Sequence, residues 1–111
     1  MTEASALNID DMARNANEAS RLLKSIANPH RLMILCLLLQ QEMTVTELNA
    51  QVPLSQSALS QHLAVLRKEG LVQTRKESLQ VWYRLASTEV EAILATLYQL
   101  YCAPSDSCAA I

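Results

Sequence analysis

The residues best suited to chemistry lie on one polar stripe between positions 55 and 68. Leu59, Leu63 and Leu66 recur at spacings of four and three, which predicts a helix with one buried face. The opposite face carries short hydroxyls and amides instead of the Lys and Glu typical of a solvated helix: Gln56, Ser57, Ser60, Gln61 and Ala64. Because Gln can pair bidentately with adenine and Ser can donate or accept a hydrogen bond, this stripe suits the major groove of DNA.

Basic side chains follow the stripe, and we count them with it as candidate DNA contacts. Arg67 and Lys68 end the helix, where they can bind phosphate or simply balance the helix dipole. Arg75, Lys76 and Arg84 flank the next segment, from which they can reach a minor groove or phosphates. His62 lies between the buried and polar stripes and fits a structural histidine better than a base reader or metal ligand.

The net charge of −2 seems to oppose nucleic-acid binding until it is divided along the chain. Residues 55–84 hold five basic residues against two acids, a net +3, whereas the remainder holds four against nine, a net −5. Phosphate attraction depends on the local field, so an acidic body with one basic edge is compatible with DNA binding. Five basic residues in thirty are also compatible with an ordinary surface, so charge alone does not decide.

Three cysteines supply the only other distinctive chemistry: Cys36, Cys102 and Cys108. The N-terminus has no basic patch followed by an apolar stretch, and no apolar run reaches eighteen residues. We therefore expect no secretory signal, no membrane span and a cytoplasmic location, where a permanent disulfide framework is uncommon. Cys36 alone fits a small buried core residue. A thiol near a loose C-terminus can also attack an oxidant, and a second thiol can resolve the product.

Local signals predict the elements that would position these residues. Helices are expected at about 10–26, 29–40 and 45–51, the second beginning at Asn28-Pro29 and the third at a capping box of Thr44 and Glu47. Ser55, which we also count as a DNA-binding candidate, caps a fourth helix that Gly70 ends. Strands are expected at 71–75 and 81–85 around a loop at 76–80, and a last helix starts at Ser87 or Thr88 and reaches Cys102.

This order predicts a mainly α fold with a small β-hairpin, a winged helix-turn-helix. Residues 44–69 form the helix-turn-helix and 71–85 the wing. We expect one domain over 1–111, with loose tails at 1–9 and 103–111.

The combined motifs closely resemble the ArsR family of bacterial repressors. They are Leu-Ser-Gln-Ser-Ala-Leu-Ser-Gln-His-Leu at 54–63, Leu-Arg-Lys-Glu-Gly-Leu-Val at 66–72 and Ala-Asn-Pro-His-Arg-Leu at 27–32. The resemblance covers roughly residues 18–102. It implies a homodimer built from the first and last helices, with two recognition helices in successive major grooves. Half-sites would lie about 34–36 Å apart on a pseudo-palindromic operator in double-stranded DNA.

The resemblance also bears on what is sensed. Thr44 and Thr46 stand where one family metal site has a Cys-x-Cys pair, and the last helix offers only Glu89 and Glu91, so no metal or other cofactor is expected. Cys36 in Ile-Leu-Cys and Cys102 in Leu-Tyr-Cys instead resemble the persulfide-sensing branch, of the HlyU, BigR and SqrR kind. In that branch an oxidant or reactive sulfur species joins the two thiols and DNA is released. Cys108 departs from the pattern.

There are four alternatives to a thiol-switched repressor, of which the first two stay open. The chain can be an ArsR-type repressor without a thiol switch, with a metal or unknown effector, or within the branch an anti-silencer that displaces a nucleoid protein. A winged-helix module for protein contacts would expose more apolar residues than the polar stripe does. A thiol enzyme would need a nucleophile with a base nearby, which the motifs do not offer, so no enzyme is expected.

Overall fold

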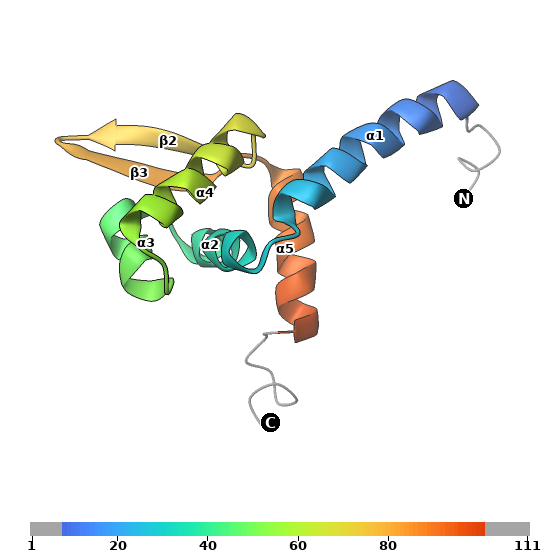
Figure 1. Cartoon of the computed structure of the whole chain (residues 1–111). Coiled ribbons are helices and arrows are strands. Elements are labelled where there is room, and N and C mark those ends of the chain that lie inside the picture. Colours follow the sequence, from blue (N-terminus) through green and yellow to red (C-terminus); the bar gives the residue numbers. More distant parts are fainter. Residues whose placement is uncertain (1–7, 102–111) are drawn as a thin grey trace.

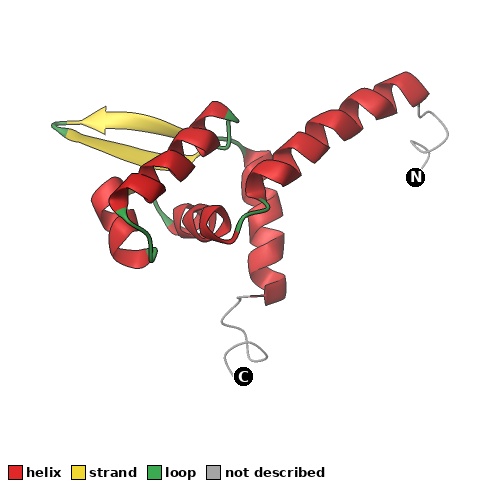
Figure 2. Cartoon of the chain, viewed as in Figure 1, coloured by secondary structure: helices red, strands yellow, loops and turns green. Residues whose placement is uncertain are grey.

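The computed structural model describes residues 8–101, and α-helices make up most of them. The elements are α1 (Ile9–Ile26), α2 (Pro29–Gln40), β1 (Met43–Thr44), α3 (Val45–Gln51), α4 (Gln56–Lys68), β2 (Val72–Glu77), β3 (Gln80–Leu85) and α5 (Thr88–Tyr101). Figure 1 shows α2 in the middle, with α1 leaving the body at one end and the β2–β3 hairpin at the other. The strands are confined to that one end (Figure 2).

Side-chain caps explain why most helices begin where they do. The Asn28 side chain accepts hydrogen bonds from the N–H groups of His30 and Arg31, and Pro29 occupies the first turn of α2. Thr44 and Glu47 form the predicted capping box, with both hydrogen bonds present. Gly70 ends the α4 region at φ +79°, in the left-handed region that favours glycine.

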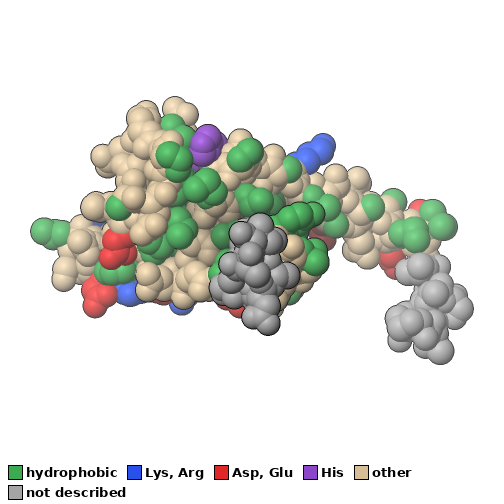
Figure 3. Space-filling view, turned by 90° about the horizontal axis from the view of Figure 1, so that it is seen from below, with side chains coloured by type: hydrophobic (Ala, Val, Ile, Leu, Met, Phe, Trp, Pro, Cys, Tyr) green, Lys and Arg blue, Asp and Glu red, His purple; other side chains and the backbone are tan. Residues whose placement is uncertain are grey.

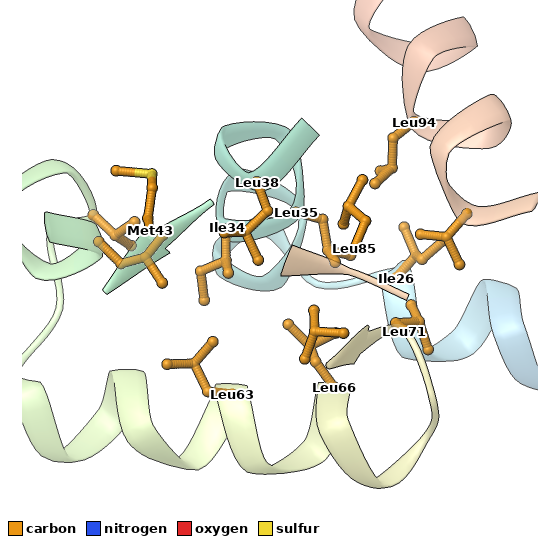
Figure 4. Close-up of a cluster of buried hydrophobic side chains, with 14 of the residues drawn as sticks. Ile26, Ile34, Leu35, Leu38, Met43, Leu63, Leu66, Leu71, Leu85 and Leu94 are labelled. Carbon is orange, nitrogen blue, oxygen red and sulfur yellow. The ribbon is translucent and has the colours of Figure 1, made fainter. Parts of the chain in front are cut away.

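The core lies between α2 and the elements that surround it. Ile34, Leu35 and Leu38 of α2 are buried, which makes α2 the central helix of the fold. Figure 4 shows Leu63 and Leu66 of α4 pointing toward them from one side, while Leu85 of β3 and Leu94 of α5 approach from others. The apolar face of α4 is therefore fixed against the body, and its polar face points outward.

The sheet corrects the strand prediction. Its order is β1-β3-β2 and all pairs are antiparallel, so the sheet has a third strand, Met43–Thr44, that the sequence did not indicate. The hairpin is also longer than predicted: positions 76, 77 and 80 belong to strands, and the expected loop at 76–80 shrinks to Ser78 and Leu79. Ser78 takes φ +60°, the positive first position of a tight two-residue hairpin turn.

The N-terminal helix begins earlier than predicted and has little support from the rest of the chain. Asn8 caps α1 and Ile9 is its first residue, so neither belongs to the predicted loose tail. Otherwise, the predicted tails lie outside the described residues. Of α1, only Ser25 and Ile26 are buried. Within residues 8–101 no single helix is long and apolar enough to cross a membrane; only α1 and α2 together, across a 95° bend, have the length and composition.

Candidate nucleic-acid interface and cysteine site

The polar stripe of α4 is exposed, as the leucine spacing predicts. Leu59, Leu63 and Leu66 are buried, whereas the groups on the opposite face are open to solvent: Gln56, Ser57, Ser60, Gln61 and Ala64. Ser55 caps the helix, because its Oγ accepts a hydrogen bond from the Ala58 N–H at 3.1 Å, and its hydroxyl hydrogen stays available to a second acceptor. The amides and hydroxyls thus form one continuous surface on a rigid helix.

The turn between α3 and α4 is held by a residue that the sequence analysis missed. The Asn49 side-chain amide donates to the Leu54 carbonyl at 2.8 Å, so α3 is tied to the segment that starts α4. Val52 is buried and Leu54 packs against the core from the same turn. An Asn near the end of a short helix is a common local signal, but the carbonyl that it binds is visible only once the turn is folded.

Arg67 and Lys68 lie exposed at the end of α4, beside a groove that Ser60, Ala64 and Tyr83 also line. Their acidic neighbour Glu69 bonds elsewhere: its Oε1 accepts from Arg21 Nε at 2.7 Å, and this hydrogen bond lowers the pKa of Glu69. In the part of the chain that the structure describes, neither Arg67 nor Lys68 forms an ion pair. Both are therefore available to phosphates.

The hairpin register divides the predicted wing residues between two faces. Lys76 is opposite Val81, on the face that holds buried Val72 and Leu85 and that faces α4. Arg75 is opposite Trp82, and Gln73 is opposite Arg84, so both arginines lie on the other face. The structure thus brings Lys76 to the α4 side and separates it from the two arginines.

A carboxylate outside the predicted site holds those arginines. Arg75 donates from Nε to Glu42 Oε1 at 2.8 Å and also pairs with Glu77 at 2.8 Å, and Arg84 lies 3.9 Å from the second Glu42 oxygen. The Arg75 guanidinium also lies 5.4 Å from the Trp82 ring centroid. The hydrogen bonds to Glu42 and then Glu77 raise the pKa of Arg75.

His62 is half-buried between α4 and the start of α2. Its ring centroid lies 5.9 Å from that of His30. Burial, and then the positive charges of Arg31 and His30, lower the pKa of His62, so the neutral form is favoured at pH 7. Its placement at this seam agrees with a structural histidine, and its part in DNA binding stays a prediction.

Cys36 lies half-buried on α2, at an open groove of about 360 Å³. The other described lining residues are Met33, Leu37, Gln40, Gln51 and Tyr98. Tyr98 belongs to the last turns of α5, whose described part ends at Tyr101. Cys102 and Cys108 lie outside the described residues. Among residues 8–101 no three His, Cys, Asp or Glu side chains gather in a way that could hold a metal ion.

Two helices joined by a tight turn, with the polar face of the second exposed and an antiparallel hairpin beside it, define a winged helix-turn-helix DNA-binding protein. Residues 28–74 match the family model described as bacterial regulatory protein, arsR family. The chain belongs to the ArsR family.

Relatives of this chain are regulators of transcription. It is 54% identical over 96 residues to the transcriptional activator HlyU of Vibrio cholerae, covering 86% of this chain and 89% of the relative. It is 44% identical to the biofilm growth-associated repressor of Agrobacterium fabrum, covering 86% and 82%. The structure of reduced HlyU from Vibrio cholerae superposes with a TM-score of 0.80 at 55% identity, covering 84% and 98%. The chain is thus a DNA-binding transcriptional regulator and not an enzyme.

Proposed function

We propose that the chain is a homodimeric repressor or anti-silencer that binds a pseudo-palindromic operator on the nucleoid, in the cytoplasm. Oxidation or persulfide bridging of Cys36 and Cys102 releases it from DNA. One of the relatives above is named an activator and another a repressor. Release of a regulator from DNA can raise or lower transcription, depending on the promoter. The proposal therefore concerns the switch and leaves the direction to the promoter.

An exposed apolar surface on α1 and at the end of α5 supports the homodimer. Along α1, apolar residues follow the helical repeat on one side, and all of the following are exposed: Ile9, Met12, Ala16, Ala19 and Leu23. Leu100 and Tyr101 at the end of α5 are also exposed, at 68% and 75%. In the view from below, hydrophobic side chains gather over the middle of the body and recur along the protruding helix (Figure 3). A second copy of the chain would cover these surfaces of α1 and α5.

The DNA contacts follow from side-chain chemistry on α4 and the wing. Gln56 and Gln61 offer amides for bidentate hydrogen bonds to adenine, and Ser57 and Ser60 offer hydroxyls that accept or donate. Phosphate contacts beside α4 come from Arg67, Lys68 and Lys76. Arg75 and Arg84, on the other face of the hairpin and bound to Glu42, remain candidates only for phosphates that flank the site. Ser55 and His62 flank the contact surface. In a dimer, two α4 helices would enter successive major grooves.

The location of Cys36 is the single observation that carries the switch. Its groove is bounded by α2 on one side and by Tyr98 of α5 on another, and Cys102 follows Tyr101 directly in the sequence. Cys102 therefore lies only four residues after Tyr98, which lines the groove that contains Cys36. That one relative was solved in a form named as reduced also favours a redox-dependent regulator.

Bridging proceeds by thiol–polysulfide exchange. One thiolate attacks a polysulfide sulfur, a Cys–S–S bond forms, and the shortened polysulfide leaves with the electron pair. The second thiolate then attacks the cysteine sulfur of this persulfide and displaces hydrosulfide, which leaves a disulfide. The two thiols lose two electrons in total, and the sulfane sulfur gains them. Because α2 packs against both α4 and α5, a bridge at Cys36 would move the helix that supports the DNA-binding face.

The test is fluorescence anisotropy of the dimer on DNA from upstream of its own gene. Reduced protein should bind, inorganic polysulfide should abolish binding, and dithiothreitol should restore it. Cys36→Ser and Cys102→Ser should bind DNA whether or not polysulfide is added, whereas Cys108→Ser, the matched control, should respond like the wild type. If polysulfide leaves wild-type binding unchanged, the chain is a regulator without a thiol switch.

A further inference from the structure

One carboxylate joins the helical body to both strands of the wing. Glu42 lies directly after Gln41, the residue that caps the C-terminus of α2, and directly before β1. Its Oε1 is 2.8 Å from both Nε and Nη2 of Arg75 on β2, and its Oε2 is 3.9 Å from Nη1 of Arg84 on β3. The Glu42 side chain is 31% exposed, so the contact is partly shielded from water.

The two arginines are held by further contacts on the same face of the sheet. Trp82, the cross-strand partner of Arg75, lies under its guanidinium, and Glu77 pairs with Arg75 from within β2. Gln73 Oε1 accepts from Arg84 at 3.5 Å. Of these groups, only Glu42 belongs to the body of the protein, because all the others lie on the hairpin itself.

The hairpin needs such an attachment because its outer half has little other support. Its base is fixed by buried Val72 and Leu85, and β1 pairs only with Trp82 and Tyr83. Beyond these residues, both strands are exposed as far as the turn, where Leu79 is 95% exposed. A two-stranded ribbon without a packed face has marginal stability on its own, so its direction depends on contacts near its base.

We propose that Glu42 is a positioning residue for DNA binding. It makes no contact with DNA itself. By holding Arg75 and Arg84 from the end of α2, it fixes the direction of the wing, so that Lys76 and the hairpin tip meet the DNA beside the major groove that α4 occupies.

The sign of the effect separates positioning from simple electrostatics. Removing a negative charge from a DNA-binding protein should tighten binding if only long-range attraction to phosphates matters. If Glu42 positions the wing, its removal should weaken binding although the net charge becomes more positive. Glu77→Gln is a matched control, since it removes the same charge from the same arginine and leaves the attachment to the body intact.

The experiment measures binding in dithiothreitol, so that it does not depend on the thiol switch. The probe is the duplex that the reduced wild-type protein selects from a random-sequence library. Glu42→Ala should bind roughly three- to tenfold more weakly, the scale of a small network of partly exposed ion pairs. Glu42→Gln, which keeps an amide oxygen as acceptor, should fall between Glu42→Ala and the wild type, and Glu77→Gln should bind as tightly as the wild type or more tightly.

Hydroxyl-radical footprinting on the same duplex locates the loss. In Glu42→Ala, protection of the outer flanks should fall while protection around the two major-groove half-sites stays, and the melting temperature should be close to that of wild type. The positioning role is refuted if Glu42→Ala, like Glu77→Gln, binds at least as tightly as the wild type. It is also refuted if protection in Glu42→Ala falls evenly along the site. If the wild-type protein selects no duplex, the chain does not bind DNA specifically. That result would contradict the proposed function, on which the role of Glu42 rests, and it is distinct from the outcomes above.

Discussion

Leu23 offers the most quantitative test of the proposed dimer. It is 54% exposed and lies on the apolar side of α1 with Met12, Ala16 and Ala19. Burying a whole leucine side chain contributes about 1.5–3 kcal/mol, so burying the 54% that is exposed contributes about 0.8–1.6 kcal/mol per protomer. A two-fold dimer buries two copies, and Leu23→Ala should therefore weaken association by about 1.5–3 kcal/mol, or roughly 10- to 150-fold.

Sedimentation velocity over a range of protein concentrations measures this change directly. Lys24→Ala is the matched control, because Lys24 is the next residue of the same exposed helix and lies off the apolar stripe. Alanine has the highest helix propensity, so neither substitution should reduce the helical circular dichroism signal. DNA binding should weaken together with dimerisation, since two half-sites need two linked recognition helices.

Two results would refute the reasoning. A wild-type protein that stays monomeric at tens of micromolar would show that the apolar stripe has another partner. A Leu23→Ala protein with the dissociation constant of the wild type would show that copies associate through a different surface. Either result would leave the fold of the monomer unaffected.

Three further predictions concern single residues. Gln61→Ala should lower operator affinity about tenfold, because a bidentate base contact is worth about 1–3 kcal/mol; anisotropy checks this, and an unchanged affinity would place Gln61 outside the interface. Gly70→Ala should cost about 1 kcal/mol in urea unfolding, since φ is +79° and nothing lies within 4 Å of an added Cβ, so backbone strain alone acts; an equal unfolding midpoint would contradict it. The pKa of His62 is below its usual 6.5 in the folded state, so stability is complete above about pH 6.5 and falls as pH drops through the folded-state pKa. Melting curves from pH 7.5 to 5.5 should show this loss in the wild type and a smaller one in His62→Asn, and parallel curves would exclude His62 as its source.

The helices could be predicted from the sequence because their limits are set by neighbouring residues. The caps at Asn28, Thr44 and Ser55 each bond to N–H groups within three positions, and Gly70 acts through its own backbone angle. The outward stripe of α4 was equally accessible, since a 3.6-residue repeat determines which face is buried. Helix limits and buried faces that depend on residues within about one helical turn can therefore be predicted from the sequence alone.

Strand β1 could not be predicted, because it depends on pairing with residues that are distant in the sequence. It has two residues, too few for an alternating pattern, and Met43 and Thr44 pair with Tyr83 and Trp82 from a distant part of the chain. The local sequence predicts that Thr44 caps a helix, a role that it also fills, but gives no sign that it pairs with a strand. The groove at Cys36 could not be predicted for the same reason, because the residues that line it come from α2, α3 and α5, which are distant in sequence.

The wing shows how one local error changes the prediction of a site. A five-residue loop leaves the pairing of the two strands open, whereas the two-residue turn at Ser78 and Leu79 pairs Glu77 with Gln80 and fixes every pair behind it. That register decides that Lys76 faces the α4 side and that Arg75 and Arg84 do not. Residues along the chain can be sorted into faces only after the turn is known.

The distribution of charge, too, can be read from the sequence only in part, because ion pairs join residues that are far apart along the chain. The net +3 of residues 55–84 counts neighbours in sequence, but Glu42, which lies outside that segment, neutralises part of it in space. Glu69, counted within the segment, is itself paired with Arg21 from α1. Within residues 55–84, the basic residues without an ion pair are therefore Arg67 and Lys68 at the end of α4 and Lys76, all on the α4 side. Folding therefore concentrates the basic edge expected from the sequence on fewer side chains, because Glu42 binds Arg75 and lies close to Arg84.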